Sequence, residues 1–211
     1  SELKKWSGKL IEVPYTKNIS SSNIKLNIVK PYMQKNNRTS LLSRLIKVKN
    51  IVRIIETHSP LSGLIAENMQ IKEKKQLVGF DGFWSSSLAD SLVRGKPDNQ
   101  SVDLSTRISA LSEILDITSK AIIFDGDNGG RIEHLPFTIN SMERQGVSAI
   151  VIEDKIGLKK NSLFKNQKDA KQDSIKNFCK KIKVAINSRK SDDFLSCVCC
   201  FHPGALVDCA L

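Results

Sequence analysis

Two apolar runs that each end in carboxylates constrain the fold of this chain more than any other feature. Residues 121–127 read AIIFDGD and residues 148–154 read SAIVIED, with a helix-like segment at 131–146 between them. Short continuous runs of Ile, Val and Phe are typical of strands that are buried on both faces of a parallel sheet. The sequence therefore predicts two neighbouring parallel strands joined by a helix.

The carboxylates at the ends of these runs predict a metal site. The first run ends in Asp125 and Asp127, and the second ends in Glu153 and Asp154. Because the carboxyl ends of parallel strands meet at one edge of a sheet, we expect these side chains to form an acidic cup. Oxygen-rich, anionic sites of this kind suit a hard divalent cation such as Mg²⁺.

A polar loop follows the second run and completes the candidate site. It carries Lys159, Asn161 and Ser162, whose ammonium, amide and hydroxyl groups would hold an anionic substrate. The pattern therefore indicates metal-assisted chemistry on a small acid.

The rest of the chain from residue 40 alternates between strand and helix patterns. We expect helices at 41–49, 60–70, 103–119, 131–146 and 173–189, and strands at 51–58, 78–87, 121–127 and 148–154. This alternation predicts an α/β fold with a parallel sheet and right-handed crossovers. Both a (β/α)₈ barrel and a doubly wound sheet place ligands at the carboxyl ends of their strands. No glycine-rich phosphate loop follows the first strand, which weakens a nucleotide-binding interpretation.

Composition excludes several classes of function. The net charge of +11 raises the possibility of nucleic-acid binding, but the basic residues are scattered and no aromatic-interleaved basic motif is present. We expect no nucleic-acid partner, and instead a positive field that attracts anionic metabolites. No apolar run reaches the roughly 18 residues of a membrane span, and no signal peptide is visible, so we expect no membrane association.

The cysteines point to a reducing compartment. Four of the five lie in the last 15 residues and no disulfide framework runs through the chain, so we expect a cytoplasmic protein. A zinc site is an alternative for this end of the chain, because it contains the possible ligands Cys197, Cys200, His202 and Cys209. The spacing lacks a second paired knuckle, which disfavours that alternative.

Several stretches in order resemble the phosphoenolpyruvate mutase family, within the isocitrate lyase and phosphoenolpyruvate mutase superfamily. They are IVRIIETHSPLSGLI, DGFWSSSLADS, KPD at 96–98, IIFDGDNGG with EH at 133–134, and VIEDKIGLKKNSLF. The resemblance implies a (β/α)₈ TIM-barrel fold, here incomplete, with about the first four βα units and four strands. It also implies an isomerase of phosphonate biosynthesis that interconverts phosphoenolpyruvate and phosphonopyruvate with Mg²⁺.

The resemblance assigns roles to individual residues. The pocket for the small-molecule substrate would be lined by Trp84, Ser86, Ser87 and Leu88, with backbone amides near Ser87 and Leu88 on the substrate carboxylate. Mg²⁺ would be held, directly or through water, by Asp125, Asp127 and Glu153. Asp98 would lie beside the migrating phosphoryl group as nucleophile or electrostatic guide. A gating loop that excludes water would carry Lys159, Asn161 and Ser162.

The resemblance also implies a domain layout. Residues 1–22 resemble the end of a cytidylyltransferase-like domain, 23–38 form a linker, 39–194 form a partial barrel, and 195–211 form an aberrant Cys-rich tail. The departures from the family pattern are Ser59 and Pro60 in place of Asn-Gly, Asn128 in place of Thr, and the end of the chain. After residue 194 the chain lacks the family's substrate-binding arginine, as a frameshift would produce. We therefore expect a truncated protein with unpaired strand edges, little activity and doubtful formation of the family's homo-oligomer.

Other interpretations remain open. Within enzymes, the chain would be a phosphonopyruvate hydrolase or a carbon–carbon lyase of the same superfamily, although Asn161 favours the mutase. Outside enzymes, it would be an inactive remnant or a basic binding module. Taken alone, Asp125 and Asp127 could also be helix caps or turn residues.

Overall fold

A parallel sheet is the centre of the fold. The computed structural model describes residues 38–73, 76–157, 159–160 and 171–199. Within them, five strands pair in the order β1-β4-β5-β6-β7, all parallel. They are β1 (Ile54–Glu56), β4 (Gly82–Ser85), β5 (Ala121–Asp125), β6 (Ala149–Glu153) and β7 (Leu195–Cys199). The α/β fold with a parallel sheet is confirmed, whereas the expectation of four strands is wrong because β7 adds a fifth.

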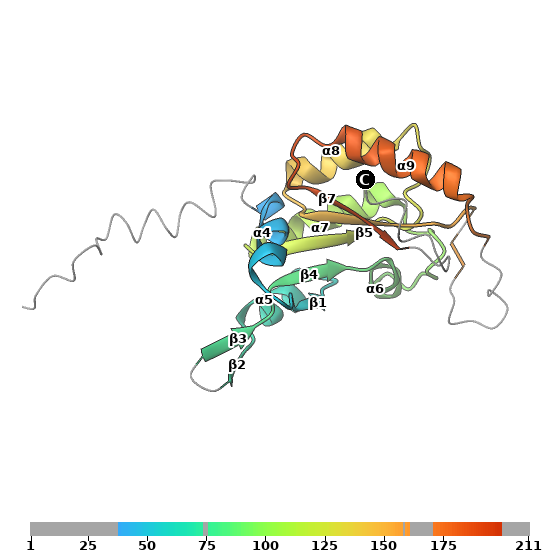
Figure 1. The fold of residues 1–211 in the computed structure, drawn as a ribbon. Coiled ribbons are helices and arrows are strands. Elements are labelled where there is room, and N and C mark those ends of the chain that lie inside the picture. Colours follow the sequence, from blue (N-terminus) through green and yellow to red (C-terminus); the bar gives the residue numbers. More distant parts are fainter. Residues whose placement is uncertain (1–37, 74–75, 158, 161–170, 200–211) are drawn as a thin grey trace, which may run out of the picture. The chain divides into compact units, whose positions relative to one another are not determined.

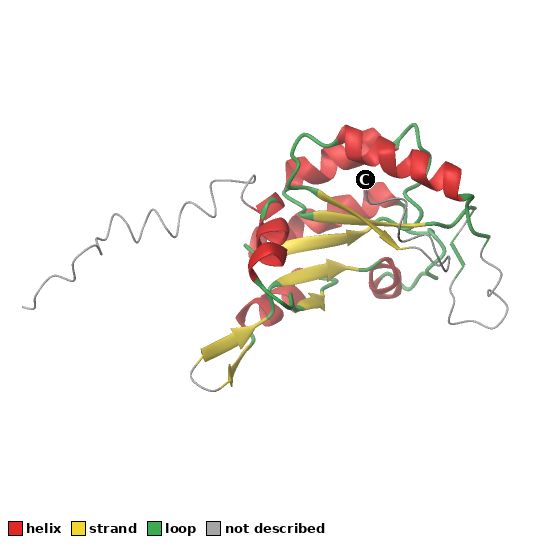
Figure 2. Ribbon diagram, viewed as in Figure 1, coloured by secondary structure: helices red, strands yellow, loops and turns green. Residues whose placement is uncertain are grey.

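Helices connect the strands and cover the sheet (Figure 1). They are α4 (Leu41–Val48), α5 (Pro60–Asn68), α6 (Ser87–Val93), α7 (Leu104–Ile117), α8 (Leu135–Gln145) and α9 (Ile175–Ser188). Helices α8 and α9 contact each other and form the helical layer beside the strands in Figure 2. None of these described helices has both the length and the apolar character needed to cross a lipid bilayer.

Local sequence signals account for several of the helix ends. Helix α7 begins after Asp103, whose carboxylate accepts a hydrogen bond from the Thr106 amide at 3.0 Å. Helix α5 begins with a reciprocal capping box between Ser59 and Ser62. Helix α8 ends at Gly146, whose φ of 89° is the left-handed conformation that glycine adopts without a steric penalty.

The segment from residue 70 to residue 93 differs most from the expectation. The predicted strand at 78–87 is divided between two strands and the start of a helix. Strands β2 (Gln70–Glu73) and β3 (Gln76–Gly79) form an antiparallel hairpin, and β4 follows as a separate strand of the main sheet. Ser86 then caps α6 by accepting a hydrogen bond from the Ala89 amide, because a serine side chain competes well for the free amides of a first turn.

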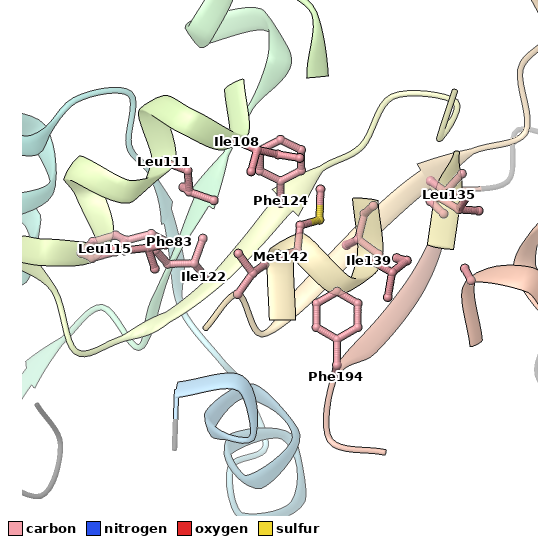
Figure 3. Packing of buried hydrophobic residues seen from close by; sticks show 14 of the residues in the cluster. Phe83, Ile108, Leu111, Leu115, Ile122, Phe124, Leu135, Ile139, Met142 and Phe194 are labelled. Atoms are coloured by element: carbon pink, nitrogen blue, oxygen red, sulfur yellow. The ribbon is translucent and has the colours of Figure 1, made fainter. Parts of the chain in front are cut away.

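Alternation along the strands separates two faces of the sheet. On β5, Ile122 and Phe124 are fully buried against α7, α8 and α9. Figure 3 shows these two side chains among the helical residues of the core; those labelled there are Ile108, Leu111, Leu115, Leu135, Ile139 and Met142. Ala121, Ile123 and Asp125 point to the other face, because successive side chains of a strand alternate. The β5 strand thus fixes the core with one face and presents Asp125 on the other.

Several expected segments lie outside the described residues. They are the cytidylyltransferase-like segment at 1–22, the linker except Arg38, and residues 200–211 of the Cys-rich tail. The side chains of Cys197 and Cys199 are not described either, so the zinc hypothesis stays a prediction. The first residue of the described part is tied to the fold, since Arg38 donates a hydrogen bond to the Thr118 carbonyl at 2.7 Å.

Candidate functional site

The candidate site lies at the carboxyl edge of the sheet. Asp125 is the last residue of β5, Glu153 is the last residue of β6, and Ser87 begins α6 directly after β4. The register pairs Trp84 with Ile123 and Asp125 with Val151. Since paired residues of neighbouring strands share a face, Trp84, Asp125 and Glu153 all lie on the face opposite to the helical core.

The turn from Asp125 to Asp127 has a tightly specified backbone. The Asp127 amide donates to Asp125 Oδ1 at 3.0 Å, and the Gly126 amide donates to the Val151 carbonyl at 2.8 Å. Asp127 itself has a φ of 52°, which is uncommon for a residue other than glycine. Its carbonyl accepts a hydrogen bond from the Glu153 amide at 2.7 Å. The turn that carries two of the predicted metal ligands is thus fastened to β6.

Lys159 brings the predicted catalytic and metal-binding residues together. Its Nζ lies 2.8 Å from Asp127 Oδ1, 3.2 Å from Asp98 Oδ2 and 3.8 Å from Asp125 Oδ2, and it also donates to the Ser87 hydroxyl. Ser87 in turn donates to Asp125 Oδ2 through its hydroxyl at 2.8 Å and through its amide at 3.2 Å. We call these five residues the Lys159 cluster. They come from four separate segments of the chain, and all three carboxylates are buried.

The charges of the Lys159 cluster support one another. Burial would raise the pKa of the Asp125 carboxyl, but the Lys159 ammonium, the Asp127 amide, Arg107 and Ser87 together hold that pKa below its usual value. Burial would likewise lower the pKa of Lys159, yet the carboxylates of Asp125, Asp127 and Asp98 raise it. The pKa shifts of Asp125 and Lys159 therefore both favour the charged forms of these two groups.

Glu153 does not join the Lys159 cluster. Its Oε2 lies 3.0 Å from Lys155 Nζ. Although each is close to a lysine ammonium, Glu153 Oε2 and Asp127 Oδ1 are buried without a hydrogen bond of acceptable geometry. Among the described residues, no three His, Cys, Asp or Glu side chains form a group that could hold a metal ion as they stand. The donor chemistry fits Mg²⁺, because buried carboxylate oxygens with unused lone pairs are the ligands this ion prefers.

The other predicted residues have different positions. Trp84 and Leu88 are half-buried, and Ser86 is engaged as the cap of α6. The Ser87 amide, predicted to hold a substrate carboxylate, donates to Asp125 in this structure. Asn161 and Ser162 lie outside the described residues, so their roles in a gating loop stay predictions.

Arg107 is the main residue of this site that the sequence analysis misses. It lies on α7 with only 1% of its surface exposed, and its guanidinium contacts Asp90, Asp127 and the backbone of the Asp125 turn. A sequence signal existed. Arg107 occupies the same face of the helix as Leu111 and Ile114, four and seven residues later, so a charged residue interrupts the apolar stripe.

Asn128 links the loops on either side of the site. Its Oδ1 accepts a hydrogen bond from Gln100 Nε2 at 3.2 Å, and its Nδ2 donates to the Gly157 carbonyl at 2.9 Å. Gln100 follows Asp98 closely in the chain, and Gly157 precedes Lys159. The residue noted in the sequence as a departure from the family pattern therefore connects the segments that carry Asp98 and Lys159.

Comparison with known proteins identifies the family. The profile of the phosphoenolpyruvate phosphomutase family matches residues 42–198, which reach into β7. A curated phosphoenolpyruvate phosphomutase from Tetrahymena pyriformis is 29% identical over 171 residues, covering 80% of this chain and 53% of the relative.

Solved structures of related proteins resemble the fold of this chain. A phosphoenolpyruvate phosphomutase from Streptomyces platensis subsp. rosaceus superposes with a TM-score of 0.68 at 26% identity, covering 77% of this chain and 53% of that chain. A phosphonopyruvate hydrolase in complex with oxalate and Mg²⁺ superposes with a TM-score of 0.61 at 27% identity, covering 80% and 53%. The chain thus spans about half the length of the relatives that it matches, and it belongs to the phosphoenolpyruvate phosphomutase family.

Proposed function

We propose that this chain carries the metal- and phosphoryl-binding part of an Mg²⁺-dependent phosphoenolpyruvate phosphomutase, which interconverts phosphoenolpyruvate and phosphonopyruvate. The reaction breaks the bond between phosphorus and the enol oxygen and forms a bond between phosphorus and carbon. The observation that carries the proposal is the convergence of Asp98, Asp125 and Asp127 on Lys159 at the carboxyl edge of the sheet.

The carboxylates supply the metal-binding part of the site. Asp125, Asp127 and Glu153 would hold Mg²⁺ directly or through water, and Asp127 Oδ1 and Glu153 Oε2 have lone pairs available for it. Bound Mg²⁺ supplies charge neutralisation for the phosphoryl and enolate oxygens. The solved hydrolase with oxalate and Mg²⁺ supports this assignment, because oxalate is a small dianionic acid like the proposed substrate.

The remaining residues would position the substrate. Lys159 provides a positive charge for the phosphoryl group, and Asp98, 3.2 Å from it, would act as nucleophile or as electrostatic guide. Trp84 and Leu88 would provide the apolar wall, and amides near Ser87 would bind the carboxylate. Phosphoryl transfer depends on positioning and charge more than on covalent chemistry, which fits a site built from charged side chains.

A phosphonopyruvate hydrolase is the second candidate, because a hydrolase is among the solved relatives at similar identity. The two activities differ in the fate of the phosphoryl group. A mutase returns it to the enol oxygen of the same molecule, whereas a hydrolase transfers it to water and releases phosphate and pyruvate. Asn161, two residues after Lys159 in the sequence, favours the mutase.

Binding of oxalate tests the site independently of turnover. We expect calorimetric titration of the chain with oxalate to show binding that requires Mg²⁺. Asp125→Asn should weaken that binding at least about tenfold, because a carboxylate ligand is lost. Asp192→Asn is the matched control, since its side chain is fully exposed and distant in the chain from the cluster. Oxalate binding that is indifferent to Mg²⁺ and to Asp125→Asn would contradict the proposed site.

Phosphorus NMR distinguishes the two reactions. After incubation with phosphonopyruvate and Mg²⁺, a mutase produces phosphoenolpyruvate and a hydrolase produces inorganic phosphate. We expect slow turnover to phosphoenolpyruvate, because the chain spans about half of its relatives. Release of phosphate would favour the hydrolase, and turnover as fast as that of a full-length relative would contradict the expected impairment.

A further inference from the structure

Arg107 makes more contacts with the site than its place in the middle of a helix would suggest. Its Nη1 donates to the Asp125 carbonyl at 2.7 Å and to Asp127 Oδ2 at 3.2 Å, and its Nη2 reaches the Ser85 carbonyl at 3.4 Å. Its Nε donates to Asp90 Oδ2 at 3.1 Å. The guanidinium thus joins the end of β4, the end of β5 and helix α6.

The orientation of this side chain is fixed by its surroundings. The guanidinium carbon lies 4.5 Å from the centroid of the Phe124 ring, so an aromatic face supports one side of its plane. Asp90 is itself buried and is held from the other side by Arg94, whose Nη1 lies 3.2 Å from Asp90 Oδ1. Arg107 therefore has little rotational freedom, and its hydrogen bonds restrict the movement of the groups that accept them.

The two oxygens of the Asp127 carboxylate have different surroundings. Oδ2 accepts from Arg107, whereas Oδ1 faces Lys159 and has no hydrogen bond of its own. By binding Oδ2 and the Asp125 carbonyl together, Arg107 orients the carboxylate and the backbone that bears it. That backbone is the turn in which Asp127 adopts a positive φ.

We infer that Arg107 is a positioning residue, which holds the Asp125–Asp127 turn so that Asp127 Oδ1 is directed toward the ligand side of the site. The inference rests on the proposed function for the identity of the ligand, but the positioning itself is a property of the protein alone. A compact ammonium cannot replace it, because Nε, Nη1 and Nη2 of the planar guanidinium reach Asp90, the Asp125–Asp127 turn and Ser85 at the same time, whereas lysine has one nitrogen.

The experiment compares Arg107→Lys with Arg94→Lys, in the full chain. Both variants keep the charge and both residues bind Asp90, but only Arg107 touches the Asp125–Asp127 turn. The first measurement is amide hydrogen exchange of Gly126 and Asp127 without metal. We expect exchange to be at least about tenfold faster in Arg107→Lys and nearly unchanged in Arg94→Lys.

The second measurement is the affinity for Mn²⁺, followed by its paramagnetic resonance. Misdirecting a ligand oxygen should weaken binding by about 10- to 100-fold in Arg107→Lys, although the net charge of the site is conserved. If Arg107 acted only through its charge, which opposes a cation, the affinity would not change in this variant, and that result would overturn the inference.

A second variant covers the case in which Arg107→Lys does not fold. Asp90→Asn leaves Arg107 and Asp127 charged but loosens the anchor of the guanidinium, so exchange of the turn should rise in the same direction by a smaller factor. Unchanged exchange in the variant that folds overturns the inference. If the unmodified chain binds no Mn²⁺, the metal assignment under the proposed function fails, while the exchange measurement still decides the role of Arg107.

Discussion

The Lys159 ammonium is the single group on which the site depends most. It is 10% exposed and faces three buried carboxylates, which would repel one another without it. Removing one partner of a buried ion pair leaves charges in a medium that solvates them poorly. Asn substitutions at single aspartates should therefore be tolerated better than loss of the lysine.

Replacing Lys159 tests this dependence. Lys159→Met should reduce the free energy of unfolding by about 3 kcal/mol, because Asp98, Asp125 and Asp127 lose their shared counter-charge. Lys160→Met is the matched control, since Lys160 is exposed, and it should change stability by less than about 0.5 kcal/mol. Urea denaturation measures both. Equal stability of the two variants would contradict the ion cluster.

The carboxyl of Asp125 predicts a dependence of stability on pH. Its pKa is lower in the folded chain than in the unfolded chain, so the folded state binds its proton less readily. The resulting stabilisation is complete above the unfolded-state pKa of about 4 and is lost as the pH falls through the folded-state pKa. Asp125→Asn should remove this part of the acid dependence. The measurement is the free energy of unfolding of the original chain and of Asp125→Asn between about pH 6 and pH 3. Parallel curves for the two proteins would contradict the prediction.

The strand-to-turn junction after β5 shows how an element directs its side chains. Gly126 has no room for a side chain, because a Cβ atom there would lie 2.7 Å from Ile150 Cδ1, 2.9 Å from Ile150 Cγ1 and 3.0 Å from the Val151 carbonyl oxygen. The glycine allows β5 and its turn to approach β6 closely. This close approach is what places the Asp127 carbonyl beside the Glu153 amide.

Gly126→Ala should therefore cost about 1–3 kcal/mol of stability, through crowding against β6. A second substitution, Ile150→Val, removes Cδ1 and should restore part of the loss. Gly130→Ala is the comparison, because its φ of 66° imposes strain while no atom lies within 4 Å of a new Cβ. Thermal denaturation of the original chain, Gly126→Ala, the double variant with Ile150→Val, and Gly130→Ala ranks their stabilities. If Ile150→Val gave no relief, crowding would be the wrong cause.

The larger of the two hydrophobic clusters among the described residues joins the sheet to three helices. Buried side chains from β4, β5 and β6 pack with those of α7, α8 and α9 in one contiguous cluster (Figure 3). The site therefore lies at the edge of the same cooperative unit that supplies the stability. Loss of packing far from the carboxylates should lower the unfolding free energy of the whole described part of the chain.

Two positions on α8 test this view. Ile139→Ala creates a cavity at a fully buried position and should cost about 2–5 kcal/mol. Phe137→Ala lies two residues away, but its ring is 76% exposed, so the change in stability should be small. Circular dichroism and tryptophan fluorescence should report the same midpoint in each protein. Separate midpoints would indicate that the sheet and the helices unfold independently.

Local sequence patterns were sufficient to predict the helices and strands whose ends and periodicity depend on residues close by in the sequence. Helix α7 with its Asp103 cap, helix α8 with its Gly146 end, and strands β5 and β6 follow from periodicity and capping alone. The carboxylates at the ends of β5 and β6 could be recognised as site candidates, because parallel strands bring such ends to one edge. The meeting of Asp98 and Asp127 was expected from the family resemblance rather than from spacing.

The remaining features of the fold and the site depend on contacts between segments that are distant in the sequence. Three consecutive serines at 85–87 do not indicate by themselves which one ends the strand and which one caps a helix. The strand β7 could not be inferred from a Cys-rich segment without its partner β6. Glu153 faces Lys155 rather than Lys159, which no local pattern indicates. The position of Arg107 on the apolar face of α7 is visible in the sequence, but its partners are not: Asp90 and Asp127, 17 and 20 residues away, bind its guanidinium. Burial and ion pairing depend on which segments meet in space, and that is settled when the sheet and its helices assemble.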